Sequence, residues 1–129
     1  MIRFRAWHNT WEEMCEVKRI RFDDEGNITT VLVKGEAFGS NAHLEEIELM
    51  QSTGLKDKNG KEIFEKDILD YNGRKVIVKW HGSFACFIYE FVDELKSRTA
   101  EWQPLYLSYY KFEIVGNSLE NPELLEVTE

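Results

Sequence analysis

The sequence predicts a mainly β protein with few, short helices. Glycine and asparagine recur at short intervals, and the apolar stretches between them are five to nine residues long, which is typical of short strands joined by turns. The 129 residues are 43% hydrophobic and 13% aromatic, enough to bury a core. A chain of 129 residues corresponds to one small domain, or to two very small ones, so the length excludes a large multidomain enzyme.

The first predicted element is a β-hairpin. Residues 14–22 and 28–34 are rich in valine, isoleucine and phenylalanine, and residues 23–27, Asp-Asp-Glu-Gly-Asn, supply a turn that tolerates positive φ. Residues 43–51 fit a short helix and an alternating strand equally well, so both alternatives stay open. Between residues 52 and 69, Asn59-Gly60 predicts a tight turn before a strand.

The clearest strand pair covers residues 75–80 and 84–92, joined by a turn at residues 81–83. Alternation places Trp80 on the face of Val76 and Val78. The second strand is apolar on both faces, which predicts a central position. We expect residues 105–110 and 111–115 to form the last strands. An asparagine before a proline at positions 121 and 122 predicts one terminal helical turn with a capping side chain.

Charge and cysteine content limit the possible partners and compartment. Sixteen basic and 24 acidic residues give a net charge of −8, which disfavours bulk attachment to nucleic acid or anionic lipid. Cys15 and Cys86 lack CxxC spacing and are expected to be buried thiols. The first residues do not resemble a signal peptide, and no apolar run has the length of a membrane span. We therefore expect a soluble protein of the reducing cytoplasm.

Three sequence blocks, taken together, resemble one family. They are Ile2 to Trp7 (IRFRAW), Met50 to Ile68 (MQSTGLKDKNGKEIFEKDI) and Ile114 to Leu125 (IVGNSLENPELL). In this order they resemble the YopX family of bacteriophages and prophages. The resemblance implies a phage-type source, a bacterial host cytoplasm, and a small SH3-like barrel in the C-terminal part. It implies no particular activity.

With this resemblance the chain divides into an N-terminal β-hairpin region, residues 1–48, packed on an SH3-like barrel, residues 49–129. Two positions depart from the family pattern. Lys66 stands where the family commonly has glycine, and Ser118 stands where isoleucine is usual. If position 66 has a positive φ, lysine there costs about 1 kcal/mol of strain, and otherwise the turn differs locally. Ser118 is expected to face solvent.

Motifs for catalysis and metal binding are absent from the sequence. His8, His43 and His81 form no HxxH or HExxH pattern, and the nearest approach to a metal site is His43 with Glu45 or Glu46. Neither a GxSxG elbow nor a phosphate-binding GxxxxGK[ST] loop occurs. We therefore predict no catalytic residues, no cofactor and no metal. A hydrolase that uses His43, His81 and nearby carboxylates is the least favoured hypothesis.

Aromatic residues supply the candidate site. The candidate interaction surface consists of Trp80, Trp102, Tyr106, Tyr109 and Tyr110, which exceed what one small core readily buries. The competing structural explanation is that Trp80 and Phe84 fill the barrel while Tyr109 and Tyr110 divide between core and rim. Our leading hypothesis is a non-enzymatic module that binds another protein or a second copy of itself, as a homo-oligomer.

The alternative is a nucleic-acid-binding module built on residues 74–91. Residues 71–111 carry six basic and four acidic groups, although the chain as a whole is acidic. In this hypothesis Arg74, Lys75 and Lys79 contact phosphates while an aromatic ring stacks on a base, with Lys96 and Arg98 adding to the local charge.

Overall fold

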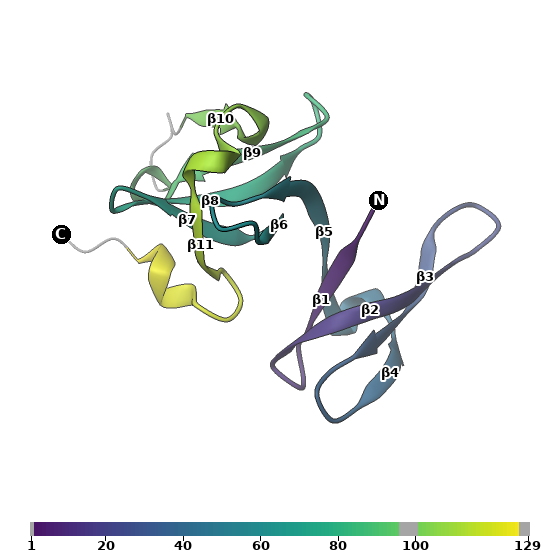
Figure 1. Ribbon diagram of the computed structural model, residues 1–129. Helices are drawn as coiled ribbons and strands as arrows, with labels where there is room; N and C mark the ends of the chain where they lie inside the picture. Colours follow the sequence, from purple (N-terminus) through teal and green to yellow (C-terminus); the bar gives the residue numbers. More distant parts are fainter. Residues whose placement is uncertain (1, 96–100, 127–129) are drawn as a thin grey trace. The chain divides into compact units, whose positions relative to one another are not determined.

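The computed structural model describes residues 2–95 and 101–126, and the chain forms two compact units, residues 2–51 and residues 52–129 (Figure 1). Both units are built from antiparallel strands, so the predicted mainly β fold class is confirmed. The helical segments in the described residues are short 3-10 turns. The division between the units falls inside strand β5, Ile47–Lys56, whose first half belongs to one unit and whose second half belongs to the other.

The N-terminal unit is one antiparallel sheet with the strand order β4-β3-β2-β1-β5. Its strands are β1 (Phe4–His8), β2 (Glu13–Phe22), β3 (Ile28–Lys34), β4 (Gly39–Ala42) and the first half of β5. The hairpin predicted for residues 14–34 is confirmed as β2 and β3. Small and β-branched side chains form the core of this unit: Ala6, Cys15, Val31, Val33, Ala42 and Ile47.

The ambiguous segment 43–51 contains both predicted structures in succession. A single 3-10 turn, η1 (Leu44–Glu46), precedes β5, and the Glu46 side chain accepts a hydrogen bond from the His43 N–H at its start. From Ile47 onward the chain pairs with β1, and the first pair is Ile47 opposite His8. Pairing with a strand near the start of the chain decides the conformation, and this information is absent from the local pattern.

The C-terminal unit contains a five-stranded antiparallel sheet with the order β10-β9-β8-β7-β11. These strands are β7 (Asp67–Tyr71), β8 (Arg74–His81), β9 (Cys86–Phe91), β10 (Trp102–Pro104) and β11 (Glu113–Asn117), and the short β6 (Glu62–Phe64) pairs with the second half of β5. The strand pair predicted for residues 75–92 is confirmed as β8 and β9. Ile88 and Tyr89, on opposite faces of β9, are both buried, as the apolar pattern predicted.

One face of this sheet carries the main core of the unit. Its buried residues are Ile63, Leu69, Val76, Val78, Tyr89, Leu105 and Phe112. The opposite face buries Ile68, Ile77 and Ile88. In the described residues the strand order ends at β10 and β11 and no pairing joins those two strands, so the SH3-like barrel stays an expectation of the resemblance.

The strand predicted for residues 105–110 is wrong. The chain instead makes two 3-10 turns, η3 (Leu105–Leu107) and η4 (Tyr109–Lys111). The pairing of β10 with β9 ends at Pro104, opposite Ile88. After this point the N–H groups of Ser108 and Lys111 donate to carbonyls three residues earlier, which closes turns in place of a strand ladder.

The terminal helical turn is confirmed as η5 (Pro122–Leu125), but the predicted side-chain cap is wrong. The Asn121 side chain points back to the preceding strand, where its Oδ1 accepts a hydrogen bond from the Asn117 N–H at 3.2 Å. The Asn121 backbone carbonyl accepts from the Leu124 N–H instead. The asparagine therefore joins β11 to the turn rather than capping the turn.

Lys66 adopts the left-handed conformation, with φ of 70°. Its N–H donates to the Val78 carbonyl at 2.9 Å, and its own carbonyl accepts from the Ser118 N–H at 3.0 Å. These two hydrogen bonds connect the β6–β7 turn to β8 and to the end of β11. The strain predicted for a lysine at a glycine-like position is thus present, and Ser118 is half-buried rather than fully solvent-facing.

Candidate functional site

The β8–β9 hairpin extends an exposed aromatic tip from the C-terminal sheet. Its last pairs are Trp80 opposite Phe87 and His81 opposite Cys86, followed by a turn at residues 82–85. Phe84, in this turn, is 64% exposed, and Trp80 is 49% exposed. Neither side chain belongs to the buried core, and the exposed part of each is available for contact with another molecule.

Three rings form a cluster at this tip, which we call the hairpin cluster: His81, Phe84 and Trp102. The ring centroids lie 5.0 Å apart between His81 and Phe84, 4.7 Å between His81 and Trp102, and 5.1 Å between Phe84 and Trp102. Trp102 is brought to the tip by β10, which pairs along β9. Because each ring contacts the other two, the cluster presents a continuous aromatic surface rather than isolated side chains.

Trp80 lies on the other face of the hairpin, where it packs edge-on against Phe87 at 5.0 Å. The competing explanation, that Trp80 and Phe84 fill the interior, is wrong, since Trp80 is about half exposed and Phe84 is mostly exposed. The hairpin continues beyond the core at Val78, and the aromatic residues that fill the core are Tyr89 and Phe112.

The five predicted interaction residues separate into smaller groups. Trp102 belongs to the hairpin cluster and Trp80 lies on the opposite face. Tyr106 is exposed on η3. Tyr109 packs partly against the core and its ring contacts that of the exposed Tyr110 at 5.7 Å. Phe84 and His81 complete the cluster; neither was predicted as part of the surface, although a phenylalanine in a hairpin turn is a signal for exposure.

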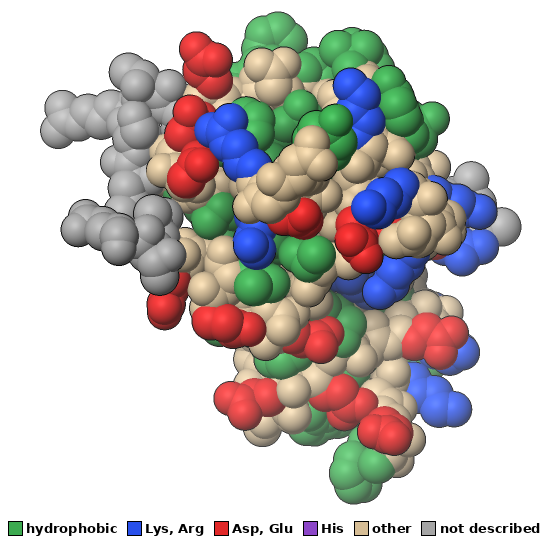
Figure 2. Space-filling view, turned by 60° about the vertical axis from the view of Figure 1, so that its left-hand side comes forward, with side chains coloured by type: hydrophobic (Ala, Val, Ile, Leu, Met, Phe, Trp, Pro, Cys, Tyr) green, Lys and Arg blue, Asp and Glu red, His purple; other side chains and the backbone are tan. Residues whose placement is uncertain are grey.

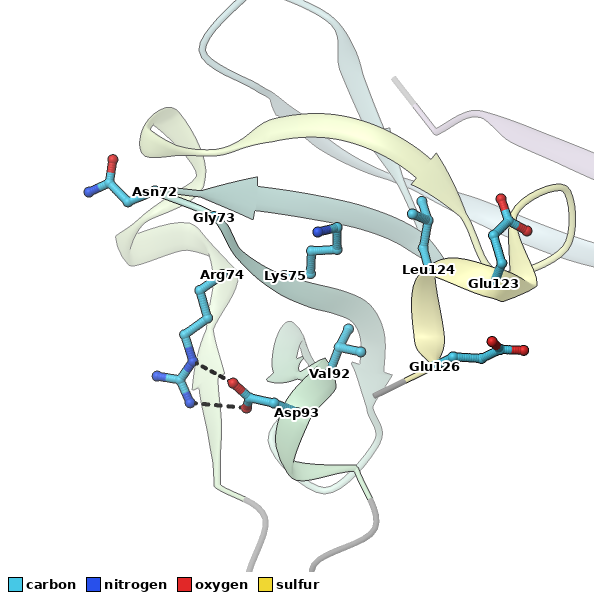
Figure 3. A pocket seen from close by; sticks show the side chains of 9 residues that line it. All are labelled: Asn72, Gly73, Arg74, Lys75, Val92, Asp93, Glu123, Leu124 and Glu126. Atoms are coloured by element: carbon cyan, nitrogen blue, oxygen red, sulfur yellow. Dashed lines mark hydrogen bonds and ion pairs between the residues drawn. The ribbon is translucent and has the colours of Figure 1, made fainter. Parts of the chain in front are cut away.

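The basic residues of the alternative hypothesis are engaged with carboxylates. Arg74 donates to both carboxylate oxygens of Asp93 at 3.2 Å, as Figure 3 shows, and lies 3.5 Å from Glu94. The hydrogen bond to Asp93 raises the pKa of Arg74 above its ordinary value. Lys79 pairs with Glu90 at 3.1 Å. Two of the three predicted phosphate contacts are therefore neutralised within the hairpin region.

The surface around these pairs has mixed charge. A cavity of about 450 Å³ next to Arg74 is lined by charged residues of both signs: Lys75 on β8, Asp93 just after β9, Glu123 on η5 and Glu126 directly after η5 (Figure 3). On the face shown in Figure 2, basic and acidic side chains are interspersed. Lys96 and Arg98 lie outside the described residues. Around Arg74 and Lys79, and on the face shown in Figure 2, the charges are therefore mixed rather than uniformly basic.

The residues of the hydrolase hypothesis lie in separate units. His43 is at the start of η1 in the N-terminal unit, and His81 is in the C-terminal unit. Among the residues that the structure describes, no three His, Cys, Asp or Glu side chains are grouped to hold a metal ion. In the same residues, every helical segment falls short of the length and apolar character that a membrane crossing needs.

Comparisons with known proteins agree with the sequence blocks. The family model described as YopX protein matches residues 3–126. The crystal structure of protein EF1440 from Enterococcus faecalis is similar over 98% of this chain and 99% of that chain, with a TM-score of 0.67 and 32% sequence identity. A comparison with curated proteins gives no match.

Proposed function

The chain belongs to the YopX family, and on this premise we propose that it is a non-enzymatic interaction module of phage type that binds a protein partner through the hairpin cluster. The first partner is a second copy of the chain. Neither the family description nor the name of the similar protein from Enterococcus faecalis specifies an activity, so the proposal depends on the geometry of the hairpin tip.

One observation supports this proposal above the others: the rings of His81, Phe84 and Trp102 contact one another while Phe84 stays 64% exposed. Clustered aromatic rings supply a large contact area at low entropic cost, and tryptophan and tyrosine are enriched where protein interfaces gain most of their energy. Tyr106 and Leu107 on η3, in the same unit, are also exposed.

The test is light scattering coupled to size exclusion on the purified protein over a range of concentrations. We expect a concentration-dependent oligomer that Phe84→Ser shifts to monomer. Phe22→Ser is the matched control, because Phe22 is 60% exposed in the hairpin of the other unit and is in no ring contact in the described residues. A monomer at every concentration would contradict self-association.

The same measurement with short single-stranded DNA at low salt separates the two hypotheses. An oligomer indifferent to DNA supports the interaction module. A monomer that shifts with DNA, and loses the shift steeply as salt rises, would replace the proposal with nucleic-acid binding through Arg74, Lys75 and Lys79.

A further inference from the structure

A second aromatic feature of the C-terminal unit is concave and lies away from the hairpin cluster. A cavity of about 410 Å³ opens between the end of β7, strand β9 and the turn η4. This volume is within the range of sites for small ligands. Its lining includes four aromatic rings, Tyr71, Tyr89, Phe91 and Phe112, together with the polar side chains of Arg74, Ser108 and Lys111.

The rings form a preformed wall. Tyr89 lies edge-on to Phe112 at 5.0 Å and edge-on to Phe91 at 5.8 Å, and Tyr71 contacts Phe112 at 6.3 Å. Tyr89 and Phe112 belong to the buried core, so their positions are fixed by packing, whereas Tyr71 is 47% exposed at the cavity mouth. An apolar planar group that enters the cavity would gain ring contacts without any rearrangement of the protein.

The charged groups of the lining are both cations, and only one of them is available. The Arg74 guanidinium lies 3.6 Å above the Phe91 ring and is already bound to Asp93 and Glu94. Lys111 is exposed, its Nζ lies 5.7 Å from the Tyr110 ring, and it is in no ion pair within the described part of the chain. The cavity therefore offers roughly one uncompensated positive charge, which suits a monoanion better than a doubly charged phosphate.

A polar pair within the lining supplies a further contact. The Tyr89 hydroxyl and the Ser108 hydroxyl lie 3.4 Å apart. This distance is longer than the usual 2.7–2.8 Å of a hydroxyl–hydroxyl hydrogen bond, so either group can turn to a ligand oxygen at little cost.

We propose that this cavity binds an aromatic ring that carries a nearby carboxylate. The ring packs against Tyr71 and Phe112, and the carboxylate accepts hydrogen bonds from the Lys111 ammonium. Two sources share this chemistry: a free aromatic carboxylic acid, and the carboxyl-terminal aromatic residue of a peptide. This cavity shares no lining residue with the hairpin cluster, so the proposal does not depend on the proposed function.

The experiment is a titration of isotope-labelled protein with 3-phenylpropionate, followed by backbone amide chemical shifts. We expect saturable shifts at Tyr71, Lys111 and Phe112, and binding of the neutral 3-phenylpropanamide about tenfold weaker, since it lacks the charge-assisted hydrogen bond. This comparison uses the unaltered protein, so it does not depend on whether a variant folds.

Variants then assign each half of the ligand. Lys111→Gln is expected to weaken the acid about tenfold and leave the amide unchanged, while Lys34→Gln, an exposed lysine of the other unit, changes neither. Tyr71→Leu is expected to weaken acid and amide alike, because it removes a ring and no charge. Phe84→Ser should leave both affinities unchanged, which separates this site from the hairpin cluster.

Two results would overturn the proposal. One is equal affinity for the acid and the amide. The other is a set of chemical-shift changes that leaves Lys111 unaffected or falls only on residues outside the cavity. A peptide with a free carboxyl-terminal phenylalanine distinguishes the sources. Binding that is tighter for this peptide than for 3-phenylpropionate supports a peptide end, and binding of 3-phenylpropionate alone supports a free acid.

Discussion

Two turns of the chain, at residues 23–27 and 57–61, have the same local hydrogen bonds in different surroundings. In each, the aspartate N–H donates to the carbonyl of the fifth residue, and the N–H of the glycine at the fourth position donates to the aspartate carbonyl. In each, one aspartate oxygen accepts from the third and fifth N–H groups at 2.9 Å. The glycines have φ of 84° and 82°.

The surroundings of the two aspartates differ completely. Asp23 is exposed, and its carboxylate accepts hydrogen bonds from N–H groups of its own turn. Asp57 is 6% exposed, and its second oxygen accepts from the Ile114 N–H at 3.0 Å, while the neighbouring Lys58 N–H donates to the Phe112 carbonyl. A short sequence is therefore sufficient to form such a turn, and two long-range hydrogen bonds, to Ile114 and to Phe112, connect the second turn to the segment that contains β11.

The largest expected effect tests this difference directly. Asp57→Ala removes three hydrogen bonds to a buried carboxylate and leaves the Ile114 N–H unsatisfied, so we expect the free energy of unfolding to fall by about 3 kcal/mol. Asp23→Ala, the matched control, is expected to cost much less. Urea unfolding measures the loss, and amide exchange of Ile114 localises it. Equal losses in both variants would mean that the bond to Ile114 contributes nothing.

Acid is expected to reveal the same contrast. Burial alone would raise the pKa of Asp57, but hydrogen bonds from the Ile114, Lys61 and Asn59 N–H groups outweigh burial and lower the pKa below its ordinary value of 3.8. The ionised carboxylate therefore adds stability above that value, and this contribution is lost as the pH falls through the folded-state pKa.

Unfolding measured at about pH 6 and at about pH 3 should show this loss in the unaltered protein and a smaller loss in Asp57→Asn. The pKa of Asp23 is also lowered, chiefly by the hydrogen bond from Asn27, so Asp23→Asn should reduce the acid sensitivity slightly. An Asp57→Asn variant with undiminished acid sensitivity would assign the effect to other carboxylates.

The same two turns show how much of the fold the sequence could predict. Both were predicted from their glycine and asparagine residues, because this turn chemistry is local. The left-handed Lys66 was anticipated only through the family resemblance, since nothing about a lysine indicates positive φ. The β1–β5 pairing and the two turns after Pro104 were not predicted, because they depend on where a distant strand lies and where a ladder ends.

The candidate site was predicted less completely for a related reason. A surplus of aromatic residues indicated that some are exposed, but composition does not say which rings meet. Trp102 meets Phe84 and His81 only because β10 returns along β9. Likewise, Lys79 and Arg74 are basic in sequence, and only cross-strand register brings Glu90 and the start of η2, Val92–Glu94, to them.

Residues of the middle and closing blocks form hydrogen bonds that join distant segments of the C-terminal unit. The middle block contributes Asp57 and Lys66, and the closing block supplies their hydrogen-bond donors at Ile114 and Ser118. Asn117 in the closing block accepts from the N–H groups of Leu119 and Glu120 in the turn that follows. In this chain the middle and closing blocks therefore join the segments around β6, β7 and β11, whereas the candidate binding sites use aromatic residues outside the blocks.

The smallest expected effect comes from replacing the glycine of each turn, which compares the backbone strain in the two turns. A Cβ added to Gly26 or Gly60 meets nothing within 4 Å, so the only cost of alanine is the positive φ. We therefore expect Gly26→Ala and Gly60→Ala each to lower the free energy of unfolding by about 1 kcal/mol. Urea unfolding of both variants checks this. Equal losses would show that the difference between the turns lies in the long-range hydrogen bonds to Ile114 and Phe112, whereas a clearly larger loss for Gly60→Ala would show that these bonds also constrain the turn backbone.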